Sequence, residues 1–252
     1  MDTLKNQKPV YQMTSTERDE ARDFVILVGR YLEKEKWERF RKFFDHLCLI
    51  QNPSNLEHPY TDSLSHGIVV AKICMRCKSD FSEVLLLAAV GHDWDRACGE
   101  KRIASSDYPN TVEGSRLYKE AHAKNSALLF CAEMEKFYPS EIVEKVRHYI
   151  LNHEIGGEGE LAILDFADGM AFFTPQLTDY FRNQRIYLDA EKNPLPSLEM
   201  EQARKRGFEI KVKFMIENMN ESCSFTVKAF VRTNLSCFEV NVINELMDIM
   251  EL

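Results

Sequence analysis

The residues of this chain that are best suited to chemistry are histidines and aspartates that fall on apolar helical patterns. Positions three, four or seven apart share one face of an α-helix. By this rule His66 shares its face with Val70, and His153 lies on the apolar stripe formed by Val146 and Ile150. Both imidazoles are therefore expected to point into the protein interior.

Two aspartates are also expected to point into the protein interior. His92-Asp93 follows Val84–Val90, which is apolar on every side, and Asp168 lies in the middle of the apolar segment Leu161–Phe173. Burying an ionisable group is costly unless it is paired or bound to a metal. A lone buried histidine or aspartate is usually a hydrogen-bonded core residue or a helix cap, but a series of them on successive helices indicates a shared role. Neutral imidazole with carboxylate suits Mn, Fe, Co, Ni or Zn, so the sequence predicts a divalent metal site.

The remaining histidines are less informative. His122 lies at the border of an apolar stripe. His148 falls on the far side of its helix and is expected in solvent, while His46 sits on a charged helix and His58 in a loop. Of these four, only His122 enters the predicted site.

The elements that must position these residues are mainly α-helices. One long helix, capped by Thr14, Ser15 or Thr16, is expected to run to about Cys48, and a loop covers Gln51–Tyr60. The stretch from Trp94 to Arg116 is expected to be a loop, and three glycines break the chain between 156 and 159. The apolar patterns predict further helices at Ser63–Lys78, Ser82–His92, Leu117–Phe137, Ser140–His153 and Glu160–Thr174.

After Pro175 the pattern changes. Phe208–Phe214 alternates with period two, as a strand would, whereas Ser224–Val231 and Phe238–Met250 fit a helix or a strand equally well. The expected organisation is an N-terminal helix and loop over residues 1–60, a metal-binding core over 61–180, and an extension of α or β character over 181–252.

Composition limits the partners. The formal charge of −8 leaves no basic footprint for duplex nucleic acid or an anionic membrane, and no apolar run is long enough to span a bilayer.

The N-terminus does not resemble a secretory signal, and seven cysteines in apolar stretches favour reduced thiols in a cytoplasmic protein. We assign Cys74 and Cys77 to helix packing, since no second pair completes a zinc site. The oligomeric state stays open.

The ordered pattern His66, His92-Asp93 and Asp168 resembles the HD-domain superfamily of metal-dependent phosphohydrolases, which is named for its adjacent His-Asp pair. The resemblance covers about residues 62 to 173. Phe166-Ala-Asp168 resembles the Ala-Asp segment of that superfamily, which selects Asp168 over its neighbour Asp165. An all-α bundle is the fold that this resemblance implies.

Two further segments extend the resemblance. His122-Ala-Lys-Asn-Ser-Ala127 is similar to a His-x-x-x-Gly/Ser-Ala helix of many members, and Val146–His153 to a Val-x-x-x-Ile-x-x-His segment. Members with both extra histidines tend to hold two metals. The resemblance thus implies one ion on His66, His92, Asp93 and Asp168, and a second on Asp93, His122 and His153.

The implied activity is hydrolysis of a small phosphorylated substrate, such as a nucleotide or a signalling phosphodiester, by metal-activated water. Trp94-Asp95-Arg96 departs from the continuations of several known subgroups, so no subgroup is assigned. Asp95 or Asp165 is expected to accept the proton of the attacking water. Glu154 is a candidate to orient a ligand. The cations expected to bind phosphate are Arg96 above all, then Lys101, Arg102, Arg116, Lys119 and Lys124.

Two alternatives belong to other classes. Some six-ligand members of the superfamily are mixed-valent di-iron oxygenases that cleave C–C or C–P bonds. The other is a non-catalytic module whose tail, residues 176–252, recognises a partner.

Overall fold

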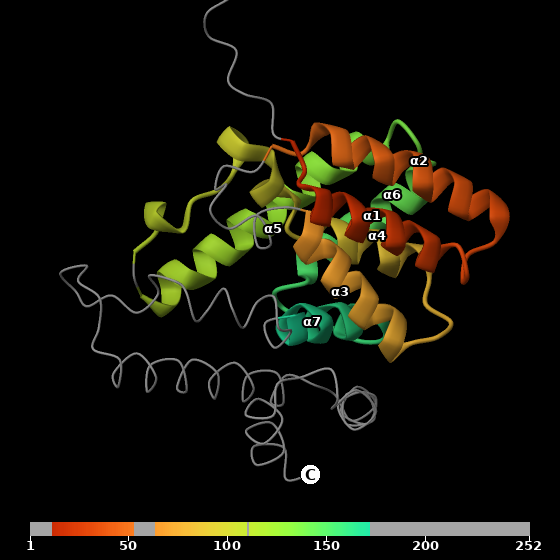
Figure 1. Ribbon diagram of the computed structural model, residues 1–252. Coiled ribbons are helices and arrows are strands. Elements are labelled where there is room, and N and C mark those ends of the chain that lie inside the picture. The colour runs from red at the N-terminus through yellow and green to blue at the C-terminus, as the bar shows by residue number, and fades with distance from the viewer. Residues whose placement is uncertain (1–11, 53–63, 110, 172–252) are drawn as a thin grey trace, which may run out of the picture.

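The computed structural model describes residues 12–52, 64–109 and 111–171, and this part of the chain is helical with no strand. The prediction of a mainly α protein is confirmed for it. Figure 1 shows the arrangement, in which the α-helices are α1 (Ser15–Val28), α2 (Lys34–Ile50), α3 (Leu64–Cys77), α4 (Glu83–Gly91), α5 (Val112–Met134), α6 (Ser140–Asn152) and α7 (Glu160–Ala171).

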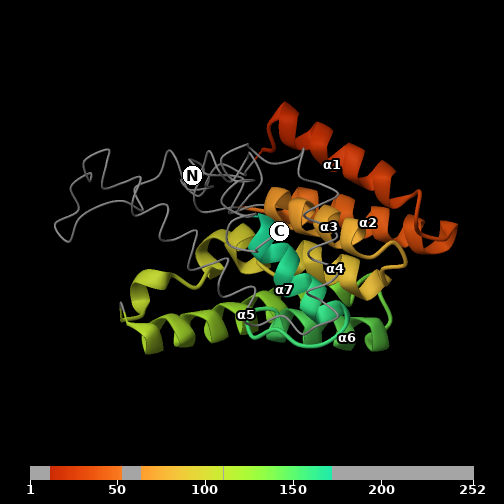
Figure 2. The ribbon, with the colours of Figure 1, turned by 90° about the horizontal axis from the view of Figure 1, so that it is seen from below.

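The centre of the bundle is α4, which is buried along its whole length. Its segment Val84–Val90 carries no polar side chain, so every face of it must be covered by other helices. The helices α3, α6 and α7 pack around it, and α5 contacts its end. Figure 2 shows α3, α4 and α7 side by side, with α5 and α6 on one side of them and α1 and α2 on the other.

Two glycines allow α4 to approach its neighbours closely. A Cβ atom on Gly67 of α3 would lie 2.4 Å from the carbonyl oxygen of Val90, and one on Gly91 would lie 2.4 Å from the ring of Phe130 on α5. Each glycine directly adjoins a histidine of the predicted site, His66 or His92. The close helix crossings therefore bring these two imidazoles together.

The single long helix expected from residue 14 to Cys48 is wrong, because two helices occupy this region. Thr14 is the predicted N-cap and forms a capping box with Glu17, but α1 ends at Val28. The chain turns back so that Phe24 packs edge-on against the ring of Phe44. A single straight helix would hold these rings apart and leave both in water, so burying them favours the turn.

The loop expected between Trp94 and Arg116 is also partly wrong. Short 3-10 helices span Trp94–Lys101 and Ser105–Asp107, and α5 begins at Val112. Thr111 caps α5, because its hydroxyl accepts a hydrogen bond from the backbone of Gly114. The glycine that suggested a loop thus lies in the first turn of a helix.

Several predictions fall outside the described residues. These are the strand Phe208–Phe214, the segments Ser224–Val231 and Phe238–Met250, the extension 181–252, His58, and the last residues of the helix expected to reach Thr174. No helix in the described ranges is long and apolar enough to cross a membrane. The cysteines of the described part are free thiols, and Cys74 is buried in the packing of α3.

Candidate metal centre

Three of the predicted ligands form a first group between α3, α7 and the end of α4. His66 Nε2 lies 3.1 Å from Asp168 Oδ1, and His92 Nε2 lies 3.3 Å from the same oxygen. The two imidazole nitrogens are 3.2 Å apart. Side chains from elements more than 100 residues apart in the chain thus converge, so one cation between them would contact all three.

A second group is formed by Asp93, His122 of α5 and His153, which caps the end of α6. His122 Nε2 lies 2.6 Å from Asp93 Oδ1, and His153 Nε2 lies 3.9 Å from that oxygen. Both histidines are fully buried. These residues are again brought together by packing, since α5 and α6 are paired along their length.

The carboxylate of Asp93 joins the two groups. Its Oδ1 faces His122 and His153, while its Oδ2 lies 3.5 Å from His66 Nε2 and 3.8 Å from His92 Nε2. One carboxylate therefore contributes an oxygen to each group. A carboxylate that bridges two cations would need this division.

Two of the histidines are oriented by the ends of their own helices. His92 Nδ1 lies 2.9 Å from the carbonyl oxygen of Ala89, and His153 Nδ1 lies 2.7 Å from that of Ile150. A carbonyl can only accept, so Nδ1–H donates in both cases, and in the neutral ring Nε2 keeps its lone pair. Such contacts on the far nitrogen hold metal-binding histidines in the correct tautomer.

His122 has a carboxylate at ion-pair distance from its far nitrogen. Its Nδ1 lies 2.8 Å from Asp95 Oδ1, and Asp95 is fully buried. The hydroxyl of Ser126 donates to Asp95 Oδ1, and the backbone of Ile103 donates to Oδ2. Asp95 is therefore held away from solvent and against the far side of a ligand ring.

The electrostatics of Asp93 match a cation-binding role. Burial alone would raise its pKa, but Arg96, His92 and His122 hold the pKa of this carboxyl well below its usual range. Arg96 Nη1 lies 2.6 Å from Asp93 Oδ2. Asp93 is thus an anion at neutral pH, as a metal ligand must be.

The pKa values of two imidazoles shift in opposite directions. Burial opposes protonation of His122, yet Asp93 and Asp95 raise its pKa to about 9. His153 behaves differently, because burial and the neighbouring His92 lower its pKa. The buried Nε2 of His153 has no hydrogen-bond partner. Leaving a buried polar atom unsatisfied is costly, and a cation at this point would satisfy it.

The site opens on its carboxylate side. The side chains of His92 and His122 are 0% exposed, whereas Asp93 is 10%, Asp168 19% and Arg96 22% exposed. The imidazoles line the closed end.

Three of the other cations expected to bind phosphate are exposed. Arg116 forms ion pairs with Glu113 and Glu120 of its own helix and is exposed. Lys101 and Lys124 are exposed, and Arg102 is half-buried. Arg96, by contrast, forms an ion pair with Asp93.

Some neighbours of the site were missed or underrated from the sequence. Lys119 Nζ lies 2.6 Å from Glu154 Oε2, in a partly buried pair beside His153. The ring of Tyr118 stacks on His122 at 5.7 Å between centroids. Ser126 lies one helical turn after His122, and this spacing was the available signal for its contact with Asp95.

Two histidines that were left out of the predicted site lie among the described residues, and one of them has a partner that the sequence did not reveal. His148 is exposed on α6 and contacts Asn152. His46, for which no partner was visible in the sequence, lies 2.6 Å from Glu133 of α5. That contact ties α2 to α5 and is separate from the candidate metal centre.

Comparison with protein-family models, with curated proteins and with solved structures finds no match to this chain. The chemistry of the site therefore has to be inferred from its own residues.

Proposed function

We propose that this protein is a metal-dependent hydrolase of phosphate esters that holds two divalent cations. The observation that carries the proposal is the shared carboxylate of Asp93, which offers one oxygen to each of two buried histidine-containing groups. A group of two histidines and a carboxylate is a sufficient ligand set for a first-row divalent ion. Two such groups joined by one carboxylate are the arrangement expected for a dinuclear hydrolase.

The ligands divide between two positions. His66, His92 and Asp168 would hold one ion and His122 and His153 the other, with Asp93 between them. Mn, Fe, Co, Ni and Zn all accept imidazole and carboxylate, so the ligand set leaves the metal open. When bound, a pair of such ions activates water for attack and stabilises charge on a phosphoryl group.

The protein also supplies a fixed cation at the partly exposed side of the site. Arg96 is kept protonated, because Asp93 raises its pKa although burial opposes this. Its partly exposed guanidinium lies at the rim next to Asp93 and Asp168, where a phosphoryl oxygen would arrive. Donors placed where negative charge develops are the usual large contribution to such a reaction.

We propose a positioning role for Asp95 in place of the proton transfer expected from the sequence. It was a candidate to accept the proton of the attacking water, but it is fully buried and lies against His122 Nδ1. We therefore assign it to positioning His122. Asp165 remains the predicted proton acceptor.

The resemblance to the HD-domain superfamily supports the same proposal. It implies a helical bundle and six ligands, and the helical bundle of the described residues and its two buried groups agree with that. The shared carboxylate of Asp93 supports two cations independently of this resemblance.

The proposal is tested by turnover. Full-length protein purified without chelator is assayed with Mn, Fe, Co, Ni and Zn against nucleotides, phosphodiesters and phosphomonoesters. Asp93→Asn should abolish turnover, and Arg96→Ala should lower kcat/KM by roughly 100-fold, the usual loss for one such donor. Arg116→Ala is the matched control, because that arginine is paired on the surface, and it should retain activity.

Other outcomes would select the alternatives. Protein that contains two metals but hydrolyses none of these substrates would contradict the hydrolase assignment. Iron bound in pairs together with oxygen consumption would favour the oxygenase. A biological role that survives Asp93→Asn would favour the binding module.

A further inference from the structure

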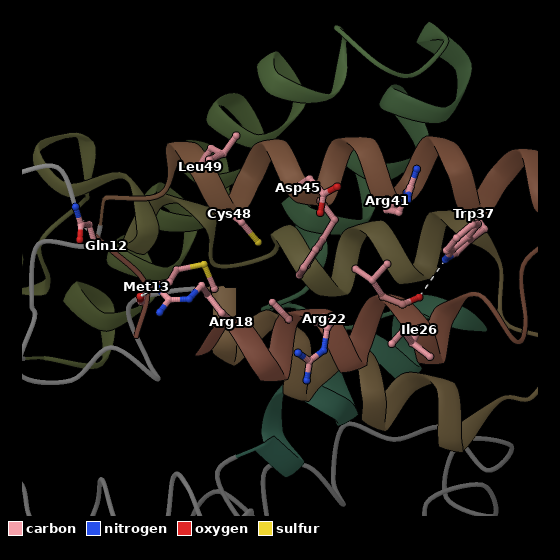
Figure 3. Close-up of a pocket in the computed structure, with 13 residues that line it drawn as sticks. Gln12, Met13, Arg18, Arg22, Ile26, Trp37, Arg41, Asp45, Cys48 and Leu49 are labelled. Atoms are coloured by element: carbon pink, nitrogen blue, oxygen red, sulfur yellow. Dashed lines mark hydrogen bonds between the residues drawn. The ribbon is translucent and has the colours of Figure 1, made fainter. Parts of the chain in front are cut away.

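A cavity of about 850 Å³ lies between α1 and α2, away from the candidate metal centre. Val25 of α1 and Phe44 of α2 are buried residues that line it, and the half-buried Trp37 closes one end by donating a hydrogen bond to the carbonyl oxygen of Val25. Figure 3 shows the lining side chains arranged along both helices. We call this cavity the α1–α2 groove.

The groove is apolar at its sides as well. Ile26 is 51% exposed and Leu49 is 77% exposed, and both line it. Exposed apolar side chains next to a cavity offer a surface that an apolar segment could cover. An apolar partner would bury both.

The charge of the groove is opposite to that of the chain. Arg18, Arg22 and Arg41 line it with a single acid, Asp45, whereas the whole chain has a formal charge of −8. Arg22 also forms exposed ion pairs with Asp19 and Asp23 of α1. The guanidinium of Arg41 lies 5.2 Å from the centroid of the Trp37 ring. Within the described ranges, no acidic group lies within ion-pair distance of Arg41. The groove therefore suits an occupant that is both apolar and acidic.

The chain contains a segment with this composition outside the described residues. Phe238–Leu252 has no Lys or Arg. Its acidic residues are Glu239, Glu245, Asp248 and Glu251, and its apolar residues include Phe238, Val242, Leu246, Ile249 and Met250. By contrast, residues 1–11 carry Lys5 and Lys8 against one acid, so they do not complement the arginines.

We propose that Phe238–Leu252 docks in the α1–α2 groove of its own chain. Its apolar residues would cover Ile26 and Leu49, and its acids would face Arg22 and Arg41. Length does not prevent this, because the chain between Ala171 and Phe238 can span roughly 200 Å when extended. Docking would place the C-terminal segment on the face formed by α1 and α2.

The experiment uses Trp37 as the reporter in the full-length chain. The other tryptophan, Trp94, is 3% exposed, so acrylamide quenching reports mainly on Trp37. Charge reversal of the segment, Glu245→Lys with Asp248→Lys, should raise the quenching constant. Charge reversal of the groove, Arg22→Glu with Arg41→Glu, should raise it too. Combining all four changes should restore the parent value, because the charges again complement one another.

Two controls make the result specific. Glu199→Lys with Glu201→Lys produces the same charge change elsewhere in the chain and should leave quenching unchanged. The segment variant alters no residue of α1 or α2, so its effect cannot arise from damage to the groove. Equal quenching in the parent and the segment variant, or a combined variant quenched more than either pair alone, would overturn the proposal. Quenching that depends on protein concentration would show docking in a second copy and would also overturn it.

Discussion

At the scale of single residues, the candidate metal centre is defined by what the far side of each imidazole contacts. His92 and His153 donate to carbonyl oxygens of their own helices, and His122 is held by Asp95. The sequence predicted His66 and His153 as inward-facing from helical periodicity, and His92 because it ends a segment that is apolar on every side. It could not reveal the contact between Asp95 and His122, because α5 must first pack beside the 3-10 helix at Trp94–Lys101.

The contact between Asp95 and His122 gives a prediction about metal affinity. Asp95→Asn keeps the size of the side chain but removes the anion behind His122. Affinity for the ion held by His122 and His153 should fall by about 10–100-fold, as is usual for such outer contacts. Titration calorimetry of metal binding measures this.

The exposed Asp107 provides the control for that prediction, and Asp107→Asn should bind both ions normally. Unchanged affinity in Asp95→Asn would mean that Asp95 does not position His122.

At the scale of elements, the close crossing of α3 and α4 determines how near His66 lies to His92. Periodicity predicted both helices, and the structure agrees to within a few residues at their ends. The break between α1 and α2 was missed, because its cause is the packing of Phe24 on Phe44, and such a tertiary contact leaves no local signal beyond Gly29. The early start of α5 was missed because Gly114 was taken as a loop residue.

The crossing gives a prediction about stability. Gly67→Ala places a Cβ against the backbone of Val90, which cannot rotate away as a side chain can. The helices must separate, so the free energy of unfolding should fall by about 1–3 kcal/mol, the usual cost of overpacking. Urea unfolding monitored by circular dichroism measures it.

Lys145→Ala, at an exposed position of α6, is the matched control and should change stability by less than about 0.5 kcal/mol. If Gly67→Ala were as stable as the parent protein, the close approach of α3 and α4 would not be required.

At the scale of the whole molecule, the candidate metal centre connects most of the bundle. Its residues come from α3, from α5 and α7, and from the ends of α4 and α6. A cation bound there would link these helices directly. Metal binding and folding should therefore be coupled.

This coupling predicts that chelation destabilises the protein reversibly. With free metal at a hundred times its Kd, binding contributes about 3 kcal/mol to the free energy of unfolding. Removing the metal should therefore lower Tm by roughly 5–10 °C. Differential scanning calorimetry before chelation, after it and after metal is restored measures the change, and an unchanged Tm in metal-loaded protein would contradict the coupling.

The central claim is that Asp93 bridges two divalent cations, and counting the metal tests it most directly. Elemental analysis of full-length protein purified without chelator should give two divalent ions per chain. His66→Ala and His122→Ala should each lose one ion, and Asp93→Asn should lose both or bind them far more weakly. Protein that binds no metal, or an Asp93→Asn variant that retains two ions, would contradict the account.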